Sequence, residues 1–291
     1  MPSGKKVDTK IAYPIIKKYE KTFSIVKMCE FMKVSRSGYY DWRKRGISRD
    51  EKKLLDIILE CGKEHKNCYG YRRVTMWIRR KYGIKINHKR VYRIMQKNGI
   101  KSVIRRKRYK KPACNGDLKY DNILDRNFVS QKPNEKWVTD ITYIPTAEGS
   151  CYLSVIRDLC GGYIVGYQYD TNQRYNLVEK TLDSAFAEES PSNLILHSDG
   201  GSQYRSYAYH KYTKEKGVTI SMSAPGSPGD NACAENFYSI FKTECLYLEK
   251  PQTIAEAYCL IDNYIHYYNN VRITGNGFTP AEIRQMAMLR C

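Results

Sequence analysis

The sequence has no run of about eighteen consecutive apolar residues, the length that a membrane-spanning helix needs. Its first six residues lead into no apolar signal region. The ten cysteines form no Cys-x-x-Cys pair and have no histidine at zinc-finger spacing, so neither a zinc finger nor a thioredoxin-like motif is predicted. These absences predict a cytoplasmic protein with no membrane partner and with scattered free thiols.

Acidic residues are scarce in one part of the chain only. Residues 1–120 contain 35 Lys and Arg against 10 Asp and Glu, whereas residues 121–291 contain 15 against 20. This asymmetry is typical of a phosphate-binding module that delivers DNA to an acidic metal site. The alternative is a cationic protein whose charge serves solubility alone.

The basic part begins with a region, residues 1–48, that is predicted to resemble a helix-turn-helix. Apolar residues recur at helical spacing from Phe23 to Met32. Ser35 is a candidate N-cap for a following helix that contains Tyr39. This pattern indicates a small helical unit.

A second helical unit is predicted over residues 49–100. A helix that starts near Tyr69 stops near Gly83, and a second helix starts at the candidate cap Asn87 and ends at Asn98. Two helices around a tight turn can lay one of them in a major groove, although helical hairpins without DNA are also common. The candidate DNA-binding residues are Arg72, Arg73, Lys89, Arg90 and Arg93.

A basic linker is predicted over residues 101–131. Seven of the eleven residues 101–111 are Lys or Arg. Such a segment can follow a DNA backbone and add salt-dependent affinity that does not depend on sequence, or it can be a solvated connector. The candidate contacts are Arg105, Arg106, Lys107 and Arg108.

From residue 132 to 291 the pattern changes to short strands that alternate with helices. Three strands come first, then a helix, a strand, a helix, a strand and two further helices. This order predicts an α/β fold, a mixed five-stranded sheet with flanking helices in the ribonuclease H-like arrangement. The predicted strands are 137–144, 152–157, 163–169, 194–197 and 218–222, and the predicted helices are 177–187, 206–216, 232–246 and 254–269.

Three acids occupy special places in this pattern. Asp140 follows the strand-like residues 137–139, Asp199 ends an apolar run, and Glu235 begins an amphipathic helix after a turn-rich segment. Thirty-five residues separate Asp199 from Glu235. Mg²⁺ prefers oxygen ligands, and two such ions can clamp the attacking and leaving oxygens of a phosphoryl transfer. The three acids are therefore predicted to be catalytic and to bind two metal ions.

The sequence around the acids resembles a known family. The motifs are residues 137–143 (WVTDITY), 197–204 (HSDGGSQY), 227–237 (SPGDNACAENF), 241–244 (FKTE) and 268–272 (YNNVR). They are similar to the OrfB proteins of OrfA/OrfB-type bacterial insertion sequences, the insertion sequence three family. These proteins are DDE transposases whose catalytic core is related to retroviral integrases.

The resemblance implies an enzyme that uses Mg²⁺ or Mn²⁺ to cut element ends in DNA and to join a 3′ hydroxyl to another strand. It implies an OrfA partner or fusion, a homo-oligomer when two ends are synapsed, and a nucleoid-associated place in a bacterial cytoplasm. Lys242 lies seven residues after Glu235, on the same helix face, and the resemblance implies a DNA contact for it. Asn231 is expected to support the site. A DNA-binding accessory protein that does not cut is the alternative.

One segment departs from the family pattern. Residues 273–278 lack the His and the Leu-Gly that commonly precede the Ser/Thr-Pro pair, here Thr279-Pro280. This difference is expected to affect the folding of the last helices or the binding of DNA rather than catalysis.

Overall fold

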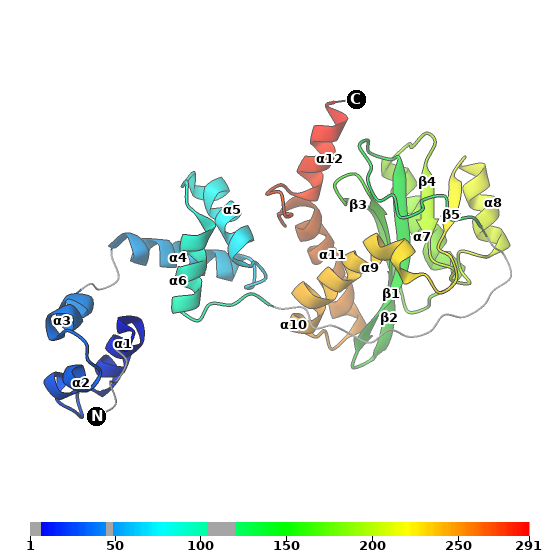
Figure 1. Cartoon of the computed structure of the whole chain (residues 1–291). Coiled ribbons are helices and arrows are strands. Elements are labelled where there is room, and N and C mark those ends of the chain that lie inside the picture. The colour runs from blue at the N-terminus through cyan, green and yellow to red at the C-terminus, as the bar shows by residue number, and fades with distance from the viewer. Residues whose placement is uncertain (1–6, 45–48, 104–119, 291) are drawn as a thin grey trace. The chain divides into compact units, whose positions relative to one another are not determined.

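The structure, a computed structural model, describes residues 7–44, 49–103 and 120–290 (Figure 1). The chain divides into two units, residues 1–60 and 61–291. The candidate DNA contacts at 105–108 lie outside the described residues. Within the part of the chain that is described, no helix is long and apolar enough to cross a membrane.

Three helices pack together in the first unit. They are α1 (Thr9–Tyr19), α2 (Ile25–Phe31) and α3 (Arg36–Lys44). Their shared core contains Ala12, Ile16, Cys29 and Tyr39. The predicted N-cap is confirmed, because the Ser35 Oγ accepts a hydrogen bond from the Gly38 amide at 3.2 Å. Helix α1 was not predicted from the sequence.

Helix α4 (Arg49–Glu64) leads to a helical hairpin made of α5 (Tyr71–Tyr82) and α6 (His88–Lys97). Helix α5 ends at Gly83, which has φ +65°, a conformation that glycine adopts without strain. Helix α6 begins after Asn87, whose side chain accepts from the Lys89 amide at 2.8 Å. The predicted stop and restart at these two residues are confirmed.

A five-stranded sheet forms the centre of the second unit (Figure 1). Its strand order is β3-β2-β1-β4-β5. The pairs β1–β2 and β2–β3 are antiparallel, and β1–β4 and β4–β5 are parallel. The bounds are β1 (Lys136–Thr146), β2 (Gly149–Asp158), β3 (Ile164–Asp170), β4 (Ile195–Ser198) and β5 (Thr219–Met222).

Helices cover both faces of this sheet, which confirms the predicted fold class. One face packs on α7 (Tyr175–Glu188) and α8 (Tyr207–Glu215) around Trp137 and Leu196. The other face packs on α9 (Ala232–Phe241) and α11 (Ile254–Asn270) around Leu153 and Val155. Alternate strand residues point to opposite faces, so each strand supplies both cores.

The helix that carries Glu235 is longer than α9 alone. A 3₁₀ turn (Pro228–Asn231) precedes α9, and a π-helical turn (Lys242–Leu246) joins α9 to α10 (Tyr247–Glu249). The chain then forms α11 and α12 (Pro280–Met288). Capping boxes begin both of these last helices, at Thr253 and at Thr279.

Candidate active site

The strand register brings Asp140 and Asp199 to the same level of the sheet. The parallel ladder between β1 and β4 ends at the pair Val138–His197. Each acid lies two residues beyond its member of that pair, and paired strands are about 4.8 Å apart. The two carboxylates therefore lie side by side where β1 and β4 separate. Asp199 directly follows β4, and Asp140 lies within β1, as it does within the predicted strand 137–144.

The two carboxylates are electrostatically coupled. Burial raises the pKa of Asp140 well above its usual range, and the charges of Asp199 and Glu235 raise it further. Burial also raises the pKa of Asp199, against the hydrogen bond that its Oδ1 accepts from the Gly201 amide at 3.0 Å. Two carboxylates that disfavour each other's charge are suited to share a bound cation.

Glu235 reaches this point from another element. It lies in the first turn of α9, with an exposed side chain. Its charge acts on Asp140, so the third predicted acid belongs to the same electrostatic cluster as the first two. The buried residues Ala234 and Phe237 hold this part of α9 against the sheet and leave Glu235 on the outer side.

Lys242 lies at the same site. Its Nζ donates to the Thr142 Oγ1 at 2.5 Å and lies 5.0 Å from the centre of the Tyr143 ring. Thr142 is two residues after Asp140 on β1, so both side chains leave the same face of the strand. The ammonium charge works to lower the pKa of Asp140. The π-helical turn that begins at Lys242 sets where this side chain leaves the helix.

The donor set fits a hard divalent cation. All three acids offer carboxylate oxygens, and Mg²⁺ usually takes one or two carboxylates and keeps several waters. Across residues 7–44, 49–103 and 120–290, no group of three or more His, Cys, Asp or Glu side chains is arranged so that it could hold a metal ion as it stands. The adjacent pair Asp140 and Asp199 is the part of the site already in place.

The candidate DNA-binding residues of the hairpin lie in two different settings. Lys89, Arg90 and Arg93 have exposed side chains on α6, and Arg72 is exposed on α5. Arg73 is only partly exposed, and its Nη1 lies 3.5 Å from Glu244 Oε1. The first four residues are therefore accessible to a phosphate backbone, whereas Arg73 is engaged with Glu244.

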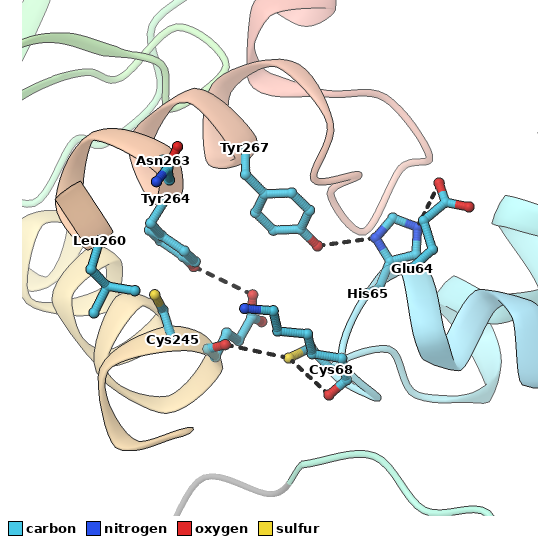
Figure 2. A pocket seen from close by; sticks show the side chains of 10 residues that line it. Glu64, His65, Cys68, Cys245, Leu260, Asn263, Tyr264 and Tyr267 are labelled. Carbon is cyan, nitrogen blue, oxygen red and sulfur yellow. Dashed lines mark hydrogen bonds and ion pairs between the residues drawn. The ribbon is translucent and has the colours of Figure 1, made fainter. Parts of the chain in front are cut away.

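Glu244 joins the hairpin to the core. It is buried and accepts two hydrogen bonds from Arg272, at 2.7 and 2.9 Å. Nearby, His65 Nδ1 lies 3.1 Å from the hydroxyl of Tyr267, and burial lowers the pKa of His65 (Figure 2). The Tyr69 hydroxyl accepts from the Ile273 amide at 3.0 Å, so the atypical segment 273–278 begins in this contact.

A cavity of about 190 Å³ lies in this junction, and Cys68, Cys245 and Leu260 are among the residues that line it (Figure 2). It is remote from the acids, because Glu244 follows Glu235 by nine residues, about 13 Å along a helix.

Three polar residues near the acids were absent from the predicted site. Tyr238 donates a hydrogen bond to the Asp140 carbonyl. Tyr204 is buried, and its hydroxyl lies 3.3 Å from Thr139 Oγ1. Arg205 lowers the pKa of Asp199. Tyr238 could have been predicted from its spacing, because it lies three residues after Glu235 and so on a neighbouring part of the helix surface.

Family models match three parts of the chain. Residues 130–228 and residues 235–288 each match a model described as an integrase core domain. Residues 48–108 match an HTH-like domain. All three acids lie in or at the edge of the integrase core matches.

Relatives match nearly the whole chain. The putative transposase InsK for insertion sequence element IS150 of Escherichia coli is 34% identical over 281 residues, which cover 94% of this chain and 98% of the relative. The chain belongs to the insertion-sequence transposase family. Transposase InsF for insertion sequence IS3A of Escherichia coli is 32% identical and covers 81% of this chain and 84% of the relative.

Solved structures of retroviral proteins are also similar to this transposase. A simian T-cell lymphotropic virus intasome, in complex with a PP2A regulatory subunit, matches at 15% identity with a TM-score of 0.48 over 78% of this chain and 74% of that chain. The HTLV-2 integrase catalytic core domain in complex with magnesium matches at 16% identity with a TM-score of 0.43 over 53% of this chain and 97% of that chain.

Proposed function

We propose that this chain is the catalytic subunit of an insertion-sequence transposase that cuts element-end DNA and joins the 3′ hydroxyl to a target strand. The observation that carries the proposal is the register of β1 and β4, which puts Asp140 beside Asp199 under the helix of Glu235. Membership of the insertion-sequence transposase family supports it.

In this proposal Asp140, Asp199 and Glu235 hold two Mg²⁺ ions, for which Mn²⁺ can substitute. When bound, these ions would activate the attacking oxygen and stabilise the leaving oxygen of the phosphodiester. Lys242 sits beside the acids and would contact a DNA phosphate or base there. The exposed cations of α6, together with the basic segment 105–108, would bind the DNA backbone.

The proposed partners follow from the reaction. Two element ends and a target must meet, so a homo-oligomer is expected on DNA. OrfA, as a separate chain or a fusion, would supply end recognition. The place of action would be the bacterial cytoplasm, on nucleoid DNA. Domain limits of 1–48, 49–100, 101–131 and 132–291 remain the proposed organisation.

The alternative, an accessory protein that binds ends without cutting, is not favoured. The chain aligns with 98% of the length of a relative named as a transposase. The register of β1 and β4, which puts Asp140 beside Asp199, also supports the enzyme. An accessory protein would require neither the coupled pair Asp140 and Asp199 nor Lys242 beside it.

The first prediction concerns the acids. Cleavage and joining are measured on a labelled duplex that carries the element's own end, with Mg²⁺ or Mn²⁺, in the presence and absence of OrfA. Asp140→Asn and Glu235→Gln should each lower the rate by at least about a thousandfold, because each removes a charge that a bound cation requires. Folding and DNA binding should remain intact.

Glu215→Gln is the matched control. Glu215 is an exposed helical glutamate that pairs with Lys211 at 4.0 Å, a surface pair of little energetic weight. The control should cut at the wild-type rate. A wild-type protein that binds element ends but stays inert with both metals, even with OrfA, would support the accessory protein instead.

A further inference from the structure

Two side chains of α9 hydrogen-bond to β1 on either side of the Asp140 peptide unit. Asn231, buried at the N-cap of α9, donates from Nδ2 to the Thr139 carbonyl at 3.1 Å. Tyr238, also buried, donates from its hydroxyl to the Asp140 carbonyl and lies 3.2 Å from the Leu153 carbonyl on β2. Consecutive carbonyls of one strand are thus bound by one helix. Asn231 and Tyr238 are called the α9 clamp below.

The α9 clamp brackets Glu235. Asn231 precedes Glu235 by four residues and Tyr238 follows it by three, so Glu235 lies at the exposed edge of the side that carries these two buried residues. A hydrogen bond on each side of Glu235 fixes both the rotation of α9 and its position along β1. The direction in which Glu235 leaves the helix, relative to Asp140, therefore depends on both bonds.

The register of the sheet explains why the Thr139 carbonyl of β1 needs a donor from outside the sheet. The parallel ladder with β4 stops at Val138, so β4 supplies no amide to the Thr139 carbonyl. A buried carbonyl without a donor is costly, and Asn231 provides the donor. The separation of β1 and β4 that creates room for the two aspartates is thus the same feature that makes Thr139 available to α9.

One atom of the clamp has no partner. Among the described residues, the Oδ1 of Asn231 is buried and accepts no hydrogen bond. Buried polar atoms in native proteins nearly always have a partner, and unpaired ones near a catalytic site indicate a group that joins when the site is filled. A water molecule held in the filled site would supply this donor.

We propose that Asn231 and Tyr238 are positioning residues, which hold Glu235 and Asp140 in the mutual arrangement that a divalent cation requires. The inference rests on the proposed function, because it assigns the clamp a role in metal binding. Neither side chain needs to touch the cation or the DNA. Outer partners that orient metal ligands commonly change metal affinity or activity by about tenfold to a hundredfold when they are removed.

The test uses two variants of the whole chain, Tyr238→Phe and Asn231→Ala, each with a control of equal burial. Tyr264→Phe is the control for Tyr238, because its hydroxyl lies 3.4 Å from Glu244 in the same apolar core but not on β1. Asn269→Ala is the control for Asn231, because Asn269 also hydrogen-bonds to a strand backbone. Its Oδ1 accepts from the Ile164 amide, and its Nδ2 donates to the Ile164 carbonyl. Each control, like the variant that it matches, loses at least one hydrogen bond of a buried side chain.

Two readouts separate positioning from stability. The first is the rise in Tm that Mn²⁺ produces without DNA, which reports cation affinity for the folded protein. The second is end cleavage with Mg²⁺ and with Mn²⁺. Mg²⁺ demands near-ideal octahedral geometry, so a displaced Glu235 should impair cleavage with Mg²⁺ more than with Mn²⁺. Both clamp variants should need about tenfold more Mn²⁺ for the same rise in Tm, whereas the controls should match the wild type.

Three results would overturn the inference. If the clamp variants keep the wild-type response to Mn²⁺ and lose only as much Tm as their controls, the clamp is structural while the proposed function stands. A loss of cleavage equal for both metals would also contradict it. If the wild-type protein neither responds to Mn²⁺ nor cuts DNA, the proposed function fails and the inference fails with it. Tyr238→Phe removes a single oxygen atom, so it decides the matter if Asn231→Ala does not fold.

Discussion

The chemistry of this chain depends on single residues that several elements bring to one place. Asp140 and Asp199 lie side by side because two strands are in register, and α9, which carries Glu235, packs against β1. Lys242 then adds a positive charge close to Asp140. A carboxylate cluster of this kind would repel a phosphate backbone by itself, and a protein cation beside it reduces that repulsion.

The prediction at this scale is for Lys242→Met, which keeps the length of the side chain and removes the charge. Cleavage of element-end DNA should fall by about tenfold, the effect of losing one charge-assisted hydrogen bond of about 1.5 kcal/mol. The rate is measured at saturating metal. The Tm should change little, because the Lys242 ammonium is partly exposed.

Lys211→Met supplies the comparison for this prediction. Lys211 is exposed on α8 and pairs only weakly with Glu215. An equal loss of cleavage in both variants would mean that general positive charge, rather than the place of Lys242, accounts for the effect.

Among the elements, the sheet and the helices that cover it were predictable because each has a strong period. Strands β1 to β5 and helices α7, α8, α9 and α11 are where the alternation of apolar residues put them. Helix α4 was not predicted, although it carries an equally good signal, with Leu54, Ile58 and Cys61 buried at helical spacing. Pro14 lies inside α1, and a proline there argues against a helix when only the sequence is read.

Other features had no signal in the sequence. The π-helical turn at Lys242–Leu246 adds one residue to a helical turn, which a 3.6-residue pattern does not reveal. The Asn231 bond of the α9 clamp depends on the Thr139 carbonyl lacking a partner on β4, and that follows only from the register of β1 and β4. Arg73 was predicted to bind DNA together with its exposed neighbour Arg72. Its partner Glu244 is distant in sequence, so the sequence did not indicate their ion pair.

The prediction at the scale of elements concerns Glu244→Gln. Glu244 and Arg272 form a buried ion pair that also involves Arg73 of α5, so the change leaves two cations without their carboxylate. The free energy of unfolding should fall by about 3 kcal/mol, as is usual when one partner of a buried pair is removed. Chemical denaturation measures the loss, and faster limited proteolysis near Tyr69 would show that the hairpin loosens from the core.

Glu249→Gln is the corresponding control. Glu249 pairs with Lys66 in the same junction, but both side chains are about half exposed. The control should lose at most about 1 kcal/mol, the usual worth of a surface pair. Equal losses in the two variants would contradict a special role for the buried pair.

For the whole molecule, the distribution of charge determines how DNA is held. In the proposed function the acids act on the scissile phosphate, whereas most of the positive charge lies before residue 121. Affinity from such a basic part arises from the release of counterions and falls steeply with salt. DNA affinity and the rate of cleavage should therefore be separable by mutation. Changes in α6 should lower the affinity, and changes in the acids should lower the rate.

The double variant Arg90→Ala/Arg93→Ala tests this separation. Both side chains are exposed on α6, and alanine preserves the helix. The slope of log affinity against log salt should become less steep by about 2, because each phosphate contact contributes about 0.9. Affinity is measured by titration of a labelled duplex at several salt concentrations. The cleavage rate at saturating protein should stay near the wild-type value, since neither residue belongs to the acid cluster.

Lys211→Ala/Lys214→Ala removes two exposed cations from α8 in the acidic part of the chain and should leave the salt slope unchanged. If the α6 variant also keeps its slope, the hairpin does not bind the DNA backbone, and the segment 105–108 or the first unit must supply the grip. If the slope falls but cleavage at saturation falls with it, α6 also orients the DNA on the acids. Only a lower slope with unchanged cleavage fits a basic part that holds DNA and an acidic part that cuts it.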